Sequence, residues 1–255
     1  MPRQPRKKSE TGVYHIILRG INRQVIFEDA EDKQKLFLKI KDFKEIIGYK
    51  VYGYCLMDNH VHLLIHEGSE PVSTIIQRLC SSYVQWYNWK YERSGHLFQE
   101  RYKSEVVEDD RYLLTVLRYI HQNPVKAGVT KLVQDYKWSS YGEYINGPVI
   151  CDTTFVLDQF KGDRYSSKET IEAFKKFSNK NNEDRCMEYD EKMRVTDEEV
   201  FASLAEINIY NISQLAQLEK SQRNEIIKSM KSIDGITIRQ ISRITGVPKS
   251  VIQRL

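Results

Sequence analysis

The chain has 255 residues, of which 40% are hydrophobic and 29% charged, with a formal net charge of +4 at pH 7. This composition is typical of a folded protein and excludes an intrinsically disordered chain. No apolar run reaches the roughly 20 residues of a membrane span, and the basic N-terminus lacks the apolar core of a signal peptide. The four cysteines are scattered without a C-x-x-C pair, so we expect free thiols in a cytoplasmic protein without a membrane partner.

The first 150 residues predict alternating strands and helices. Segments rich in β-branched and aromatic residues predict strands at 12–20, 49–57, 60–68 and 101–108. Helical spacing of apolar residues predicts helices at 29–48, at 71–93 and at 111–122, the last ending at Asn123-Pro124. This order favours an α+β fold, a ferredoxin-like (RRM-like) antiparallel sheet with helices packed on it.

The rest of the chain has a different pattern. The polar segment 151–190 predicts a linker containing one helix, and 191–255 predicts a small all-α domain. Its last part combines an apolar set, a turn at Gly246 and a proline in the first turn of a second helix (Ile241, Ile244, Val247, Pro248, Ile252). This spacing is typical of a helix-turn-helix, whose second helix can enter the DNA major groove, although other helical hairpins share it.

Two histidines stand two positions apart in the apolar run "MDNHVHLLI" (57–65). Residues i and i+2 of a strand share a face, so His60 and His62 point the same way, with Val61, Leu63 and Ile65 on the opposite, core-facing side. Two neutral imidazoles in this arrangement can bind one divalent cation. The alternative is a pair satisfied by hydrogen bonds on a half-exposed sheet face.

The predicted helix near residue 120 offers further groups to such a cation. Tyr119 and Asn123 are four residues apart and share a helix face. An amide oxygen suits Mg²⁺ or Mn²⁺, and a cation that binds the target phosphate would favour attack by the nearby phenolate. Two alternatives stay open: Asn123 caps a short helix at 124–128, or Tyr119 is a core aromatic residue.

Five blocks resemble the HUH single-tyrosine transposase superfamily, and most of all the REP-associated tyrosine transposases. They are "YHIILRGINRQVIF" (14–27), "YGYCLMDNHVHLLI" (52–65), "RSGHLFQERYKS" (93–104), "LRYIHQNPVKAG" (117–128) and "WSSYGEY" (138–144). The resemblance covers roughly residues 1–148, and the C-terminal segment resembles the helix-turn-helix of the replication initiator DnaA. We therefore expect three parts, at 1–150, 151–190 and 191–255.

The resemblance implies a metal-dependent single-stranded DNA endonuclease and strand transferase that acts on hairpin-forming repeats. It places the catalytic tyrosine on Tyr119 and the metal ligands on His60, His62 and Asn123, with a 5′-phosphotyrosine intermediate. Relatives include monomers and domain-swapped dimers, so a homodimer is compatible with the sequence. The basic residues expected to contact DNA are Arg3, Arg6, Lys7, Lys8, Arg101, Lys103, Arg239, Lys249 and Arg254.

Two other functions fit the same residues. One is a DNA-binding regulator that keeps the fold without cleavage, and the other is a metal-dependent hydrolase that uses water. The aromatic-rich segment 81–92 either stacks on bases or packs its helix on the sheet. His15, His96 and His121 receive no role, although the closeness of His121 to Tyr119 and Asn123 in the sequence is compatible with a place at the rim of the site.

Overall fold

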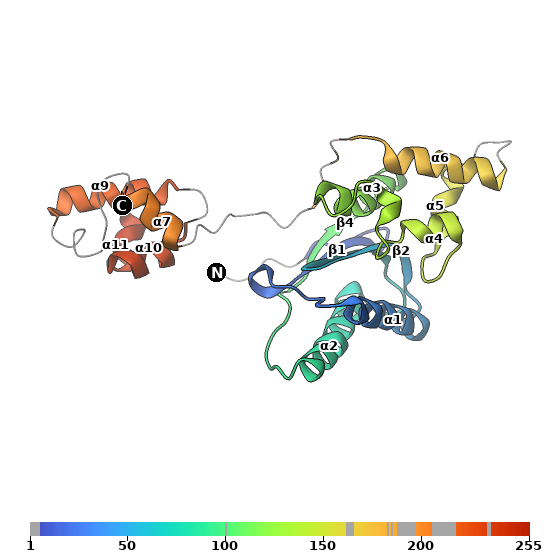
Figure 1. The fold of residues 1–255 in the computed structure, drawn as a ribbon, viewed down its shortest axis with the longest axis horizontal. Coiled ribbons are helices and arrows are strands. Elements are labelled where there is room, and N and C mark those ends of the chain that lie inside the picture. The colour runs from blue at the N-terminus through green and yellow to red at the C-terminus, as the bar shows by residue number, and fades with distance from the viewer. Residues whose placement is uncertain are drawn as a thin grey trace. The chain divides into compact units, whose positions relative to one another are not determined.

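The computed structural model describes residues 6–99, 101–161, 166–182, 184, 186–187, 197–205, 218–233 and 236–255. The chain divides into two compact units, Met1–Tyr189 and Asp190–Leu255. Each unit has its own hydrophobic core, and the two are described separately (Figure 1). None of the described helices has the length and apolar character needed to cross a membrane.

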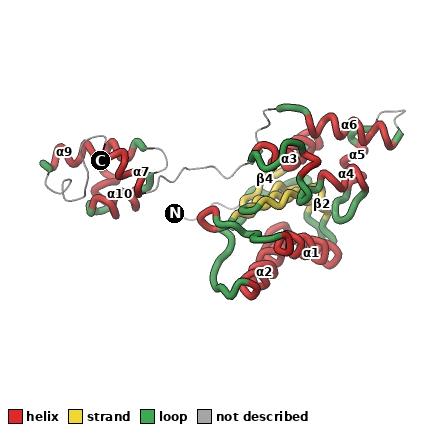
Figure 2. Tube along the Cα trace, viewed as in Figure 1, coloured by secondary structure: helices red, strands yellow, loops and turns green. Residues whose placement is uncertain are grey.

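A four-stranded sheet forms the centre of the first unit (Figure 2). Its strands are β1 (Val13–Arg19), β2 (Lys50–Met57), β3 (His60–His66) and β4 (Lys103–Val106). They lie in the order β2-β3-β1-β4, and every neighbouring pair is antiparallel. The fold is therefore α+β with a ferredoxin-like sheet, and this prediction is confirmed.

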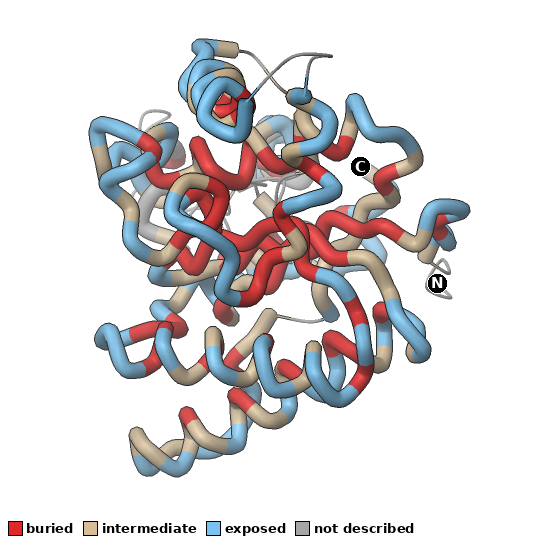
Figure 3. The backbone as a smooth tube through the Cα atoms, turned by 90° about the vertical axis from the view of Figure 1, so that its right-hand side faces the viewer, coloured by how far each residue is buried: buried red, intermediate tan, exposed pale blue. Residues whose placement is uncertain are grey.

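Two long helices cover one face of the sheet, below it in Figure 1. They are α1 (Ala30–Ile47), which begins at a capping box made by Asp29 and Asp32, and α2 (Val72–Lys90). Val61, Leu63 and Ile65 of β3 pack in the core on this side, as their alternation predicts. Both helices alternate buried and exposed segments along their length, as amphipathic helices do (Figure 3).

The other face of the sheet is covered by α3 (Asp110–Lys126), with α4 (Tyr141–Asn146), α5 (Thr153–Asp158) and α6 (Ser167–Asn179) beyond it (Figure 1). Short 3-10 turns lie at Ile21–Arg23 and Val133–Asp135. The segment 151–190, expected as a linker with one helix, contributes both α5 and α6 to this layer. Phe174 of α6 is 1% exposed and stacks on Tyr144, with ring centres 4.6 Å apart.

Helix α3 does not end at Asn123-Pro124, and this prediction was wrong. The helix continues to Lys126, and the Ala127 N–H donates to the Asn123 carbonyl at 2.9 Å. Proline removes one N–H and disfavours helical geometry before it, but the cost is limited within the last turn of a helix packed on the sheet. Asn123 therefore lies inside α3 and does not cap a separate helix.

The second unit is helical. Its described helices are α7 (Asp197–Ala205), α9 (Lys220–Lys231), α10 (Ile238–Thr245) and α11 (Lys249–Arg254). A small core holds them together (Val200, Leu204, Ile227, Met230, Ile241, Ile244, Ile252). Gly246 lies between α10 and α11 with φ of 71°, a conformation that favours glycine. The short turn expected between the last two helices is present.

Candidate active site

Strand β3 carries the two histidines on the face that α3 covers. The side chain of His62 is only 2% exposed, and His60 is half-buried. Their rings meet edge-on, with centres 5.0 Å apart. The pair is thus enclosed between the sheet and α3, and the expected alternative of a half-exposed sheet face does not describe His62.

Asn123 reaches His60 from the last turn of α3. Its Oδ1 lies 3.1 Å from Nε2 of His60, while the other ring nitrogen, Nδ1, lies 2.7 Å from Oδ1 of Asn59. Asn59 belongs to the turn before β3, and its carbonyl accepts a hydrogen bond from the Gly20 N–H. The His60 ring is therefore held from both sides by amide groups.

Tyr119 lies one helical turn before Asn123 and packs against the histidines. Its ring centre is 5.6 Å from that of His62, with the two planes at 80°. The side chain is 3% exposed, and Nζ of Lys126 lies 5.0 Å from the ring centre. The structure thus brings together all four residues that the sequence predicted for catalysis and metal binding.

Two residues that the sequence analysis missed extend this cluster. His15 of β1 lies on the same sheet face, and its Nε2 is 3.0 Å from Nδ1 of His62. The opposite nitrogen of His15, Nδ1, lies 3.5 Å from Oε2 of Glu105 on β4. Since Nδ1 of His62 is occupied by His15, only its Nε2 is left for a cation or substrate.

Burial sets the charge state of these imidazoles. Desolvation lowers the pKa of His15 and of His60, and it lowers that of His62 well below the usual value. Burial works against the Glu105 charge as well, but hydrogen bonds from His15, the Met187 N–H and Tyr112 outweigh it and lower the pKa of Glu105. The histidines are therefore neutral at pH 7, the form that binds metals.

The donor set fits a divalent cation. Ligands at about 2.1 Å from a common ion and at right angles lie about 3 Å apart, which matches the separation of His60 Nε2 and Asn123 Oδ1. Among the described residues, no group of three or more His, Cys, Asp or Glu could hold a metal ion. A site here therefore depends on the Asn123 amide and on further ligands from water or substrate.

Other residues that the sequence analysis named lie outside this cluster. His121 is fully buried beside α4, where its Nε2 lies 2.8 Å from Oγ of Ser140, so it does not lie at the rim of the site. It is on the α3 face opposite to the cluster because it is two residues from Tyr119. In α2, Tyr83 and Tyr87 pack in the core while Trp89 is 77% exposed, and exposed His96 takes no part in the cluster.

The basic residues expected to contact DNA belong to both units. Arg3 lies outside the described residues. Arg6 stacks on Tyr102, and Lys7 and Lys8 are exposed. Lys103 is the first residue of β4, and Arg101 lies two residues before it. In the second unit the expected contacts lie exposed on the last two helices (Arg239, Lys249, Arg254).

Comparison with known proteins finds similar sequences for the N-terminal part of the chain. Residues 8–123 match the family model described as "Transposase IS200 like", a range that runs from before β1 to Asn123. A curated relative from Haemophilus influenzae, named as a REP-associated tyrosine transposase, is 28% identical over 132 residues, which cover 44% of this chain and 74% of that protein.

Two solved structures are also similar to the chain. A REP-associated tyrosine transposase bound to a REP hairpin is 19% identical, covers 65% of this chain and 99% of its own, and has a TM-score of 0.49. A Deinococcus radiodurans protein described as a transposase is 18% identical, covers 48% and 97%, and has a TM-score of 0.33.

The family model and the named relative support a DNA-processing enzyme of the tyrosine transposase class. Residues 8–123 are similar to the IS200-like transposases, and the resemblance to REP-associated tyrosine transposases is confirmed.

Proposed function

We propose that the chain is a metal-dependent single-stranded DNA endonuclease and strand transferase that acts on hairpin-forming repeats. The observation that carries the proposal is the contact between the Tyr119 ring and His62, beside the His60–Asn123 pair. The name of the Haemophilus influenzae relative and the family model support the transposase activity. The four groups meet within one chain, and a homodimer stays a prediction.

The chemistry follows from the groups present. His60, His62 and Asn123 would hold Mg²⁺ or Mn²⁺, which when bound polarises the phosphate and stabilises the charge of the departing oxygen. The Tyr119 oxygen loses its proton and attacks phosphorus, forming the 5′-phosphotyrosine bond as the P–O3′ bond breaks and the 3′-oxygen leaves with a proton. The free 3′-OH of a strand can later attack the phosphotyrosine and release Tyr119, so no nucleotide cofactor is consumed.

The test is the formation of a covalent protein–DNA adduct. The full chain is incubated with Mn²⁺ and end-labelled single-stranded DNA that contains the inverted repeats nearest its gene, and adducts are resolved on a denaturing gel. We expect an adduct with the natural chain and none with Tyr119→Phe. Tyr91→Phe is the matched control, because Tyr91 follows α2 on the opposite face of the sheet and bonds to Asp32.

The same gel separates the other two functions. Cleavage that persists in Tyr119→Phe without an adduct would support hydrolysis by water. Binding without cleavage in any variant would support a regulator, and either result would overturn the proposed intermediate. Removal of Mn²⁺ by EDTA is expected to abolish the adduct while the protein stays folded.

A further inference from the structure

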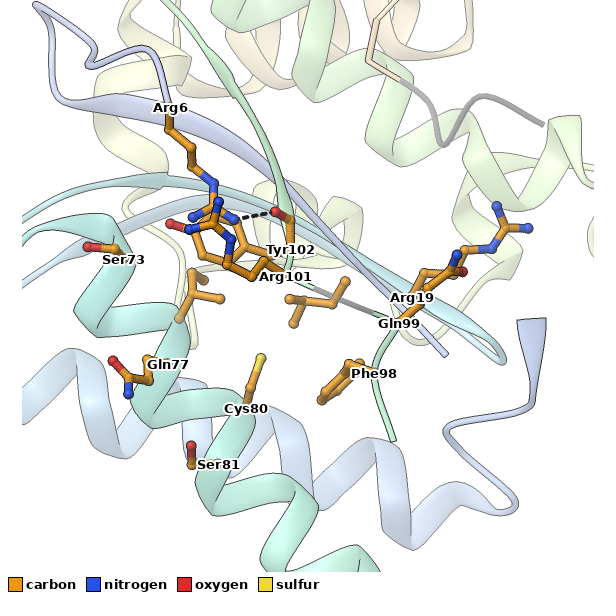
Figure 4. A pocket seen from close by; sticks show the side chains of 12 residues that line it. Arg6, Arg19, Ser73, Gln77, Cys80, Ser81, Phe98, Gln99, Arg101 and Tyr102 are labelled. Carbon is orange, nitrogen blue, oxygen red and sulfur yellow. Dashed lines mark hydrogen bonds between the residues drawn. The ribbon is translucent and has the colours of Figure 1, made fainter. Parts of the chain in front are cut away.

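A cavity of about 470 Å³ lies on the opposite face of the sheet from the histidines, between α2 and the chain that enters β4 (Figure 4). Its volume is within the roughly 300–1,000 Å³ of pockets for small ligands. Leu18 and Ile76 form an apolar floor, to which half-buried Cys80 and Phe98 contribute. The cavity belongs to the first unit and involves none of the proposed metal ligands.

The walls of the cavity are polar and cationic. Three side chains of α2 at intervals of four residues, Ser73, Gln77 and Ser81, lie on one helix face and line one wall. Arg6 and Arg101 lie across from them, with the Arg6 guanidinium 3.7 Å above the Tyr102 ring centre. No acidic residue is among the described residues of the lining, so the cavity favours an anionic ligand.

Several polar side chains of this lining have no hydrogen-bond partner among the described residues. The side chains of Ser73, Gln77, Ser81, Gln99 and Arg101 make no hydrogen bond or ion pair with any described residue. The Tyr102 hydroxyl is buried without a hydrogen-bond partner in the described part of the chain. Donors, amides and an aromatic ring around an apolar floor match a ligand that has both a phosphate and a flat heterocycle.

The cavity adjoins the candidate active site through β1. The Gln99 N–H donates to the Arg19 carbonyl at 2.7 Å, and Arg19 is the β1 residue opposite His60. At about 4.8 Å between neighbouring strands, Phe98 and His60 are roughly 10 Å apart across β1. Lys103 lies opposite Ile17 on edge strand β4, two residues after Arg101 of the cavity lining. A few nucleotides of single-stranded DNA can span this distance.

We propose that this cavity binds one unpaired nucleotide of the DNA strand next to the bond that is cleaved. The base would enter against Phe98 and the apolar floor, with Gln77 and Gln99 facing its polar edge, and the phosphate would lie at Arg6 and Arg101. Stacking on an aromatic ring and arginine contacts to phosphate are the usual basis of single-strand binding. The identity of the ligand as DNA rests on the proposed function, but the cavity itself is tested without cleavage.

The first experiment follows the floor of the cavity directly. The full chain with Tyr119→Phe, without metal, is titrated with each of the four deoxynucleoside monophosphates while methyl NMR signals of Leu18 and Ile76 are recorded. We expect both signals to shift with at least one nucleotide and to stay unchanged with inorganic phosphate at equal ionic strength. Equal shifts with inorganic phosphate would show that the cavity binds anions without recognising the base, and this would overturn the proposal. The absence of a shift with any nucleotide would overturn it as well.

The second experiment measures DNA binding by fluorescence anisotropy with a random 12-nucleotide single strand and a duplex of the same length. Ser81→Trp, which fills the cavity from its rim, and Arg101→Ala are each expected to weaken single-strand binding roughly tenfold and to leave duplex binding unchanged. Lys41→Ala, an exposed residue of α1, is the matched control for Arg101→Ala. Equal weakening of both DNAs, or none, would overturn the proposal.

Failure of the proposed function has a different signature. Neither experiment measures cleavage, so an intact chain that forms no adduct would overturn the phosphotyrosine mechanism and leave these binding results standing. Conversely, an adduct that forms normally in Ser81→Trp, with unchanged single-strand affinity, would overturn the cavity assignment alone.

Discussion

At the scale of single residues, the contact between His15 and His62 determines which ring nitrogen of His62 is available to a metal ion. The 3.0 Å contact occupies Nδ1 of His62, and Glu105 lies behind His15 at 3.5 Å. A partner that fixes the ring orientation and tautomer of a metal-binding histidine commonly contributes a factor of 10–100 in metal affinity. At the proposed metal site, we therefore expect His15 to be a positioning residue that acts through His62.

We expect His15→Phe to weaken Mn²⁺ binding about tenfold, because the aromatic ring fills the space but offers His62 no hydrogen bond. Mn²⁺ affinity is measured by electron paramagnetic resonance, independently of cleavage. His15→Gln, which keeps a polar partner, is expected to recover part of the affinity, and His96→Phe is the control on an exposed histidine. Unchanged affinity in His15→Phe would contradict the positioning role.

A second prediction at this scale concerns acid. Burial lowers the pKa of His121 to about 3, against about 6.5 in the unfolded chain. Between these pH values His121 is protonated in the unfolded chain but not in the folded chain. The free energy of unfolding therefore falls as the pH drops from 6.5 toward 3. The loss from this one histidine is up to about 1.4 kcal/mol for each pH unit.

The measurement is the free energy of unfolding by urea, in EDTA, from pH 7 to pH 4. His121→Gln is expected to be less stable at pH 7, because the aromatic packing around His121 and its contact with Ser140 are perturbed, but to have a shallower pH dependence by about one proton. His96→Gln is expected to retain the natural dependence. A slope unchanged in His121→Gln would show that His121 does not stay neutral in the folded chain.

At the scale of elements, the placement of α3 on the sheet determines whether Tyr119 meets the histidines. A Cβ added to Gly53 of β2 would lie 2.5 Å from Cδ1 of Leu117, two residues before Tyr119. The missing side chain at 53 therefore permits the close approach of α3 to β2.

We expect Gly53→Ala to destabilise the first unit by about 1–3 kcal/mol, the usual cost of overpacking, and to slow adduct formation because α3 must shift. Urea unfolding and the adduct gel measure the two effects. Gly142→Ala on α4 is the matched control, since its added Cβ meets only Asn146 at 3.9 Å. Equal stability of the two variants would show that Leu117 simply rotates away.

Elements were largely predictable from the sequence because hydrophobic periodicity is local. The period of two placed His60 and His62 on one face, and helical spacing placed Tyr119 and Asn123 together. His15 and Glu105 were missed because they meet through pairing of β1 with β3 and β4, strands distant in sequence, which no local pattern reveals. The predicted end of α3 was wrong because packing on the sheet outweighed the tendency of a residue before proline to leave the helical conformation.

At the scale of the whole molecule, the extent of the first unit is the main question. The sequence pattern placed its end near residue 150, since the polar segment that follows has only a weak apolar stripe. Yet Arg118 on α3 makes a bidentate ion pair with Asp184, with N–O distances of 2.7 and 2.8 Å. The Gln122 side chain also donates hydrogen bonds to the carbonyls of Ser178 and Lys180. The chain beyond 150 therefore binds the back of the helix that carries Tyr119.

A chain shortened to residues 1–189 is consequently expected to unfold in one sharp thermal transition and to form the DNA adduct. A chain shortened to 1–150 loses α5 and α6, which leaves Tyr144 and His121 without Phe174. Its destabilisation should be at least that of Phe174→Ala in the full chain, about 3–5 kcal/mol, and adduct formation should fall with it. Calorimetry and the adduct gel compare the three proteins. The 1–150 chain should melt at the lower temperature, because removing a helix layer that buries aromatic side chains exposes apolar surface. Equal melting temperatures for the 1–150 and 1–189 chains would show that α5 and α6 do not stabilise the unit.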